Sequence, residues 1–500
     1  MLNKARYNTL SALFLELCVF ISGFAISRLI ISEYGSACNG LISSITQWLS
    51  FVTLLSAGVA AVTKSALFKP LAEHNDREIS SILRACELFL RKVVAIYGIY
   101  LVILMHIFPM LVSQEFEKQY TVSLLLIISV NSIVQYCFGL TYQTLLEADQ
   151  RKYIINALSA MAYVVNMMAA FLLIRNHSSV LLVKAVWTVV FAGVPIVVNI
   201  YARRKYHILR KITPDYAAIS QRWSAFAHTL AGYIHSSTDF FVLTVFSTVT
   251  EISVYQVYGM IAIGMRKLVT TFDSGMYAAF GKMIATGEKE KLDESTRAFE
   301  CLIFFITTIL FSSTLILIIP FIRLYTINVS DVDYNRPVFA IFLVLAEMMY
   351  CLRIPYNSLV VATGQYKQTK KYVVSEAVIN FSISLMLVKR FGITGVAIGT
   401  CCAMTFSTIL IAIYANSNIL LRKSSEFWKR LIVTGICVCS SCFASKSIGG
   451  LTNDSWIHWT VNGILTFAET LGVTTIFFII FFSTDMRKMK QYVLTRRSRK

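Results

Sequence analysis

The sequence has few charged residues for its length. Only 15% of its 500 residues are Asp, Glu, Lys or Arg, whereas soluble globular proteins contain roughly 25%. A soluble chain of this length would form several domains with polar surfaces. Hydrophobic residues instead make up 56% of the sequence, and the mean hydropathy is +0.65. The composition therefore excludes an ordinary soluble protein and predicts an all-α protein that crosses a membrane many times.

The sequence also lacks the motifs of common enzyme and metal-binding classes. It has no Walker A motif, and so no intrinsic use of ATP, and no GxSxG, DxD-like or HExxH motif. Its 7 histidines are scattered. Cys437, Cys439 and Cys442 lack the paired spacing of a zinc site, so we expect them to pack between helices. We therefore expect no catalytic residue, no metal site and no cofactor, and a function other than catalysis.

Long apolar runs recur along the whole chain. A membrane-spanning helix needs about 20 mainly apolar residues, and we expect about fourteen such helices in this sequence. Lys4 and Arg6 precede the first run, which has no small-residue cleavage site, so we expect a permanent helix there. The predicted helices cover approximately residues 8–31, 40–65, 90–112, 121–145, 154–174, 179–201, 223–246, 253–281, 298–322, 336–361, 372–388, 394–415, 430–446 and 457–483.

Basic residues gather in every second loop. If the N-terminus is cytoplasmic, the inner segments carry most of the Lys and Arg, for example at 203–205 and 487–500. The outer loops hold only Lys118, Arg175, Arg336, Lys389, Arg390 and Lys446. This asymmetry follows the positive-inside rule and predicts that both termini are cytoplasmic. It also accounts for the net charge of +19 without a nucleic-acid partner.

The chain contains an internal repeat. GVAAVTKSALFKPLAEHND, from Gly58, resembles GMYAAFGKMIATGEKEKLD, from Gly275. YQTLLEADQRKYIINALSAMAYVVN, from Tyr142, resembles YNSLVVATGQYKQTKKYVVSEAVIN, from Tyr356. Within the second match, the aligned pairs are Gln150 with Gln365 and Asn166 with Asn380. Both matches occur in the same order and at nearly the same spacing along the chain, which indicates a duplication.

The duplication predicts the domain organisation. An even number of helices per copy keeps the same orientation, so a pseudo-two-fold axis along the membrane normal would relate the copies. Two such bundles facing a cavity are typical of alternating access. We expect a six-helix lobe at residues 1–205, a second six-helix lobe at 206–420, two extra helices at 421–486 and a basic cytoplasmic tail at 487–500.

Ionisable side chains deep in the predicted spans are the candidate functional residues. Each costs a few kcal/mol or more unless it faces a cavity or a partner. The candidates are Glu16 and Arg28 in the first helix, His228, His235 and Asp239 in the seventh, Arg266, Lys267 and Asp273 in the eighth, and Glu347 and Arg353 in the tenth.

The seventh predicted helix carries three of these residues. His228, His235 and Asp239 are spaced by 7 and 4 residues, which places them on one face of an α-helix. That face either bonds to a neighbouring helix or forms the wall of a wet cavity. In both interpretations Asp239 does not face lipid.

Arg266 and Lys267 are adjacent in the eighth predicted helix. Neighbouring side chains diverge by about 100°, so one carboxylate does not easily pair with both. A guanidinium suits a phosphate because it can bond in a bidentate manner. An ion pair of Arg266 with Asp239 or Glu347 is the alternative. Glu16 and Glu347 could also be neutralised by protonation, which makes them candidates for ion coupling.

Several segments resemble the polysaccharide flippases of bacterial surface-glycan clusters, of the O-antigen and capsule type. They are RLIISEYG, GVAAVTKSALFKPLAEHND, STDFFVLTVFSTVTEISVYQVYGM, LLEADQRKY and VVATGQYKQTKKY. These flippases belong to the superfamily that includes multidrug extrusion transporters and the lipid II flippase. The resemblance implies a non-enzymatic transporter of the bacterial cytoplasmic membrane that moves undecaprenyl-diphosphate-linked oligosaccharide to the outer leaflet for surface polysaccharide synthesis.

The resemblance also implies roles for the buried residues. The diphosphate would bind Arg28, Arg266, Lys267 and Arg353, and the cavity or ion-coupling residues would be Glu16, His228, His235, Asp239, Asp273 and Glu347. The coupling ion could be a proton or sodium. Expected partners are the lipid-linked oligosaccharide, membrane lipids and other membrane proteins of polysaccharide assembly.

Two other functions fit an integral membrane protein. A multidrug or cation antiporter of the same superfamily commonly has twelve helices, so the extra pair at 430–446 and 457–483 favours the flippase. A membrane polysaccharide polymerase needs a large outer loop, which the sequence lacks.

Overall fold

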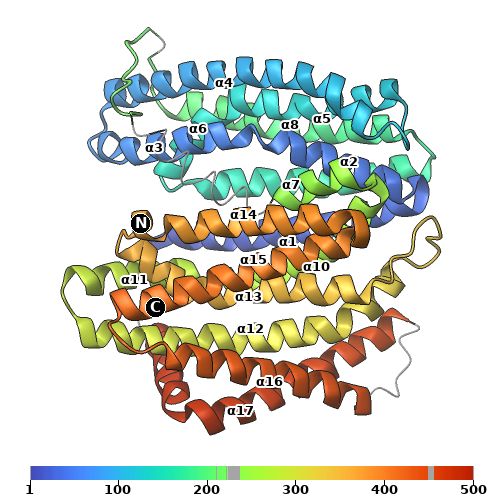
Figure 1. Cartoon of the computed structure of the whole chain (residues 1–500). Coiled ribbons are helices and arrows are strands. Elements are labelled where there is room, and N and C mark those ends of the chain that lie inside the picture. The colour runs from blue at the N-terminus through green and yellow to red at the C-terminus, as the bar shows by residue number, and fades with distance from the viewer. Residues whose placement is uncertain (1, 210, 221, 223–236, 449–454, 499–500) are drawn as a thin grey trace. The chain divides into compact units, whose positions relative to one another are not determined.

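The computed structural model describes residues 2–209, 211–220, 222, 237–448 and 455–498. These residues form helices, turns and loops and contain no β-strand (Figure 1). The chain divides into two compact units, Met1–Ser253 and Val254–Lys500, which we call unit 1 and unit 2. The predicted all-α class is confirmed. The predicted lobe boundaries at 205 and 420 stay predictions.

Unit 1 contains the helices of the first half of the chain. The short helix Ser237–Phe246 also belongs to this unit, and α10 begins near its end. The π-helical turn η1 joins α5 to α6 in one long helix. The bounds are α1 Leu2–Tyr34, α2 Ser36–Ser50, α3 Thr53–Ala72, α4 Asp76–Leu111, α5 Lys118–Val134, η1 Gln135–Gly139, α6 Leu140–Ala148, α7 Lys152–Arg175, α8 Val180–Lys205 and α10 Val249–Thr270.

Unit 2 contains the remainder of α10 and the helices that follow. Within it α14 packs on α15, α13 on α15, and α12 on both α13 and α17. The two C-terminal helices, red in Figure 1, lie beside α12. The bounds are α11 Asp273–Ala285, α12 Lys289–Tyr325, α13 Pro337–Ala362, α14 Tyr366–Phe391, α15 Ile393–Tyr414, η2 Ala415–Ile419, α16 Ser425–Ile448 and α17 Trp456–Ser498.

Eleven helices among the described residues are long and apolar enough to cross a membrane. They correspond to eleven of the predicted spans, which confirms a polytopic membrane protein. The predicted helix 223–246 falls mostly outside the described residues. The predicted helices 40–65 and 253–281 are wrong as continuous helices, because each is broken into two.

The two breaks have the same form. α2 and α3 are separated by Phe51–Val52, and α10 and α11 by Thr271–Phe272. At the first break the Thr53 hydroxyl donates to the carbonyl oxygen three residues earlier at 2.5 Å, and at the second the Thr271 hydroxyl does so at 2.6 Å. Hydroxyl groups that bond to these carbonyls compete with the helical ladder and bend it. Such bonds also occur inside continuous helices, for example from Thr308 to the carbonyl of Phe304 in α12, so they accompany the breaks without identifying them.

The helices repeat along the chain. The spacing between the starts of corresponding helices is nearly constant for four pairs, α2 with α10, α4 with α12, α7 with α14 and α8 with α15. The corresponding helices α4 and α12 contain Pro109 and Pro320 near their C-terminal ends. This common spacing across four pairs of helices supports the duplication that the sequence indicates.

The turn that precedes α7 and α14 corrects one aligned pair. Gln150 and Gly364 both have positive φ, 55° and 71°. The next amide donates to the carbonyl five residues earlier, at 2.7 Å from Arg151 and 3.1 Å from Gln365. This is a Schellman helix end, in which the left-handed residue occupies a fixed position. Gln150 therefore corresponds to Gly364, and the pairing with Gln365 was wrong by one residue.

Candidate functional site

Arg266 on α10 forms an ion pair with Glu347 on α13. Arg266 Nη1 lies 2.9 Å from Glu347 Oε2 and 3.3 Å from Oε1. The two side chains are 18% and 12% exposed, so the pair is mostly shielded from solvent. The sequence left Asp239 and Glu347 as alternative ion-pair partners of Arg266, and the structure places Glu347 against it.

Arg353 on α13 has a similar partner that sequence reasoning missed. Its Nη1 lies 2.5 Å from Glu376 Oε2 on α14 and donates to Ser407 Oγ on α15 at 2.8 Å. Glu376 is buried. The signal was available, because Glu376 lies inside the predicted span 372–388 and a carboxylate there requires a partner.

Tyr350 connects the two ion pairs. The Cζ atoms of Arg266 and Arg353 lie 4.9 Å and 5.0 Å from the centroid of its ring. At this distance the electron-rich face of an aromatic ring attracts a guanidinium. We call Arg266, Glu347, Tyr350, Arg353 and Glu376 the two-arginine cluster.

The sequence of α13 explains how the cluster forms. Glu347, Tyr350 and Arg353 are spaced by three residues, so each lies about one helical turn from the next. α10 and α14 then supply one oppositely charged side chain each. The cluster contains two guanidinium groups and two carboxylates, so its formal charge is zero, as burial in a medium of low polarity favours.

The other candidates of unit 2 lie outside the two-arginine cluster. Lys267 is exposed, in contrast to the half-buried Arg266, as the divergence of adjacent side chains predicts. Asp273 begins α11 and accepts a hydrogen bond from Ser358 of α13. The roles proposed for Lys267 and Asp273 stay predictions.

The candidates of unit 1 are only partly described. Asp239 is buried in the short helix Ser237–Phe246, in agreement with the prediction that it does not face lipid. His228 and His235 lie outside the described residues. On α1, Glu16 is exposed and Arg28 is half-buried. Their roles in a site also stay predictions.

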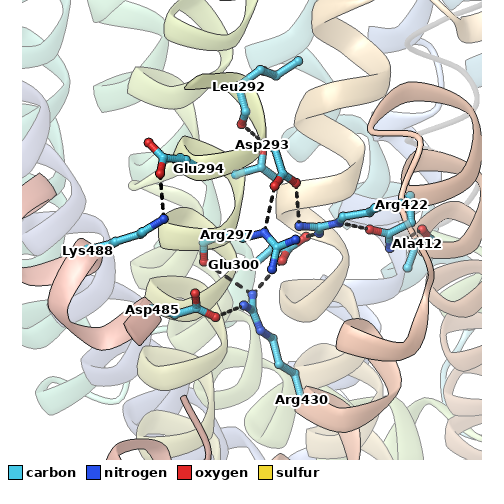
Figure 2. Close-up of polar contacts among 12 residues, drawn as sticks. Leu292, Asp293, Glu294, Arg297, Glu300, Ala412, Arg422, Arg430, Asp485 and Lys488 are labelled. Carbon is cyan, nitrogen blue, oxygen red and sulfur yellow. Dashed lines mark hydrogen bonds and ion pairs between the residues drawn. The ribbon is translucent and has the colours of Figure 1, made fainter. Parts of the chain in front are cut away.

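A second charged group in unit 2 was not anticipated from the sequence. Figure 2 shows Arg430 of α16 between Glu300 of α12 and Asp485 of α17. Arg430 and Glu300 are fully buried, and Arg430 Nη1 lies 2.6 Å from Glu300 Oε2. Arg422 also pairs with Glu300. We call Glu300, Arg422, Arg430 and Asp485 the α12 charge cluster, and it attaches the two C-terminal helices to α12.

The α12 charge cluster has a simpler counterpart in unit 1. Glu87 lies as far from the start of α4 as Glu300 lies from the start of α12, so the two glutamates correspond in the duplication. Glu87 accepts a hydrogen bond from the Tyr142 hydroxyl at 2.8 Å and pairs with Arg84 on its own helix at 3.2 Å. In the second copy the corresponding glutamate instead pairs with two arginines, one of them on α16.

Comparison with known proteins identifies the fold. No family model matches the chain, and no curated protein matches it. A solved structure of the lipid II flippase MurJ in an inward closed conformation matches with a TM-score of 0.74 at 14% identity, over 95% of this chain and 99% of that chain.

Multidrug resistance transporters of the MATE family in the MOP superfamily also match. An inward-facing conformation gives a TM-score of 0.66 at 13% identity, over 80% of this chain and 93% of that chain. An outward-facing conformation gives 0.53 at 12% identity, over 81% and 94%. At these identities the likeness shows the fold alone, and this fold is the one seen in transporters of the MOP superfamily.

Proposed function

We propose that this protein is a flippase that moves undecaprenyl-diphosphate-linked oligosaccharide repeat units across the bacterial cytoplasmic membrane by alternating access, for the synthesis of surface polysaccharide. The likeness to a lipid II flippase over 95% of the chain is the observation that carries the proposal. The headgroup of such a lipid is large, polar and anionic, so it cannot cross hydrocarbon unaided. The protein would be a transporter and not an enzyme.

The arginines of unit 2 supply the chemistry that the substrate requires. Arg266 on α10 and Arg353 on α13, a helix that can cross a membrane, present planar guanidinium groups, and such groups bind phosphate through two parallel hydrogen bonds. Lys267 and Arg28 complete the proposed set of cations. The sugars would occupy a hydrated cavity while the lipid tail stays in the bilayer.

The proposed ion-coupling residues are carboxylates and histidines. Asp239 and Glu347 are buried, and a carboxylate in such a place can bind a proton or a sodium ion. Glu16, Asp273, His228 and His235 belong to the same proposal. Membrane lipids and other polysaccharide-assembly membrane proteins are the proposed partners.

Gene deletion tests the function directly. In the deletion strain, undecaprenyl-linked repeat units are expected to accumulate in the cytoplasmic leaflet, and surface glycan is expected to disappear. Both should be restored by the intact gene but not by Arg266→Ala at normal protein levels. Arg323→Ala, at the end of α12, is the matched control and should restore export.

A multidrug or cation antiporter is the second candidate, because MATE structures share the fold. The MATE matches cover 80% to 84% of this chain, less than the 95% of the flippase match, which favours the flippase. Normal surface glycan with altered drug sensitivity in the deletion strain would establish the antiporter and refute the flippase.

A further inference from the structure

Resting on the proposed function for the identity of the ligand, we infer that the two-arginine cluster is a masked diphosphate site. In the structure Glu347 forms an ion pair with Arg266, and Glu376 forms one with Arg353. The diphosphate headgroup displaces these two carboxylates when it binds, and they return when it leaves. Glu347 and Glu376 therefore act as internal counter-ions that control access to the arginines.

The geometry of the ion pairs permits this exchange. Both pairs are made through Nη1, so neither carboxylate is shown in the two-bond fork geometry that gives the strongest guanidinium–carboxylate contact. A guanidinium has five N–H donors, and a phosphate oxygen pair can use the forked edge. A phosphate bound to that edge thus uses a second guanidinium N–H donor that neither ion pair uses.

Tyr350 positions both arginines for one ligand. Its ring centroid is about equally far from the two Cζ atoms, at 4.9 Å and 5.0 Å, so both guanidinium groups lie beside the same ring. Two linked phosphate groups can bridge such neighbouring cations, with one phosphate on each guanidinium. The ring also offsets the repulsion between the two cations when the carboxylates have moved away. Tyr350 is a positioning residue in this scheme.

Masking makes the site selective for two linked anions. An unpaired guanidinium in a shielded environment is unfavourable, so each arginine keeps a counter-ion at every stage. A monophosphate can replace only one carboxylate, whereas a diphosphate replaces both in a single binding event and pays the association entropy once. The structure thus favours a lipid diphosphate over the corresponding monophosphate.

Binding to the purified full-length protein tests the inference. The probes are undecaprenyl diphosphate and undecaprenyl monophosphate, titrated in nanodiscs and measured by thermophoresis. We expect the wild type to prefer the diphosphate. Glu347→Gln and Glu376→Gln remove a competing anion and should each tighten diphosphate binding about tenfold, while transport slows because release is slower. Glu294→Gln is the control. It removes an exposed carboxylate that pairs with Lys488 and should change neither the affinity for the diphosphate nor the rate of transport.

The role of Tyr350 is tested separately. Tyr350→Leu should weaken diphosphate binding, whereas Tyr350→Phe keeps the ring and should restore it. A structural role alone would lower stability in Tyr350→Leu without changing the preference for diphosphate over monophosphate. If Glu376→Gln does not fold, Glu347→Gln and the two Tyr350 variants decide the question.

The outcomes separate this inference from the proposed function. If both Glu→Gln variants bind the diphosphate as weakly as the wild type, or more weakly, while the wild type still transports lipid-linked oligosaccharide, masking is refuted and the flippase stands. If neither the wild type nor the variants bind or transport an undecaprenyl-linked lipid, both proposals fail.

Discussion

Arg430 shows how strongly a single residue can be constrained in this protein. Its guanidinium is fully buried and bridges Glu300 and Asp485, which belong to helices far apart in the sequence. An arginine whose partners come from two other helices links both of them, because without it Asp485 would lose this counter-ion and Glu300 would keep only Arg422. This side chain therefore contributes to the attachment of α16 and α17 to α12, beside contacts such as that of Ser313 with Thr470.

Arg430→Ala is expected to destabilise the protein by about 3–5 kcal/mol. It removes the positive charge that lies between the buried carboxylates of Glu300 and Asp485. Thermal unfolding of the purified protein in detergent measures the loss. Arg297→Ala removes a partly exposed arginine from a neighbouring turn of α12 and should change the midpoint little. Equal midpoints for the two variants would contradict the role assigned to Arg430.

Asp149 provides a pH-dependent contact outside the membrane-spanning helices. Burial raises the pKa of its carboxyl, but hydrogen bonds from three neighbours outweigh burial and hold the pKa below its usual range. The donors are the side chains of Tyr206, Lys4 and Arg151. A carboxyl with a lowered pKa in the folded state stabilises the protein above the ordinary pKa of about 4 and loses that contribution as the pH falls through the folded value.

Asp149→Asn is therefore expected to lower the unfolding midpoint at pH 7. The difference from the wild type should shrink as the pH falls below about 4, since the wild-type carboxyl then becomes protonated. Melting curves between pH 3 and pH 7 test this. Glu73→Gln, an exposed carboxylate at the end of α3, is the control. A difference that stays constant with pH would contradict the expected titration of Asp149.

At the scale of elements, α2 packs closely against the start of α10 and the short helix before it. A Cβ added to Gly40 would lie 1.6 Å from the carbonyl oxygen of Val249, so only glycine permits this contact. Asn39 donates to Ser253 Oγ at 2.8 Å, and the hydroxyl oxygens of Ser44 and Thr244 are 2.6 Å apart. All these residues are in unit 1. The contact joins a segment of the first predicted lobe to one of the second.

Alternating access requires contacts between the predicted lobes to separate during each cycle. In the double variant Ser44→Cys, Thr244→Cys, a disulfide between the two introduced cysteines is therefore expected to reduce transport at least tenfold. A reducing agent should restore transport. The protein should first be freed of its native cysteines. Export of lipid-linked oligosaccharide with and without the reductant is the measurement.

A disulfide between two helices that stay together is the matched control. Ser313 on α12 and Thr470 on α17 have hydroxyl oxygens 2.8 Å apart, and both belong to unit 2. Crosslinking Ser313→Cys to Thr470→Cys should leave transport unchanged. Full transport by the crosslinked Ser44–Thr244 pair would show that this contact does not open.

For the whole molecule, the charge asymmetry predicts the orientation. Alkaline phosphatase fused after His177 is expected to be active, because that loop is predicted to be outside, and inactive after Lys205, which lies in a basic inner loop. A fluorescent protein that folds only in the cytoplasm should give the opposite pattern. Alkaline phosphatase activity in the fusion after Lys205, and none in the fusion after His177, would show that the orientation is the opposite of the one proposed.

Local sequence patterns were sufficient to predict most of the helices. Eleven predicted spans match helices that can cross a membrane, since hydrocarbon forces the backbone to satisfy its own hydrogen bonds and long apolar runs then become helices. The breaks after Ser50 and Thr270 were missed because neither contains Pro or Gly, and hydroxyl groups that bend a helix are weak signals.

The sequence by itself indicated that the chain lies in a membrane, that it is all-helical and that it is duplicated. These properties depend on composition and on distances along the chain. The sequence also identified Arg266, Arg353 and Glu347 as buried charges that require partners. Only the tertiary structure decided which partners they have. The contacts of Arg266 with Glu347 and of Arg353 with Glu376 join different helices, and several carboxylates satisfied the same electrostatic requirement. Helix packing selected among them.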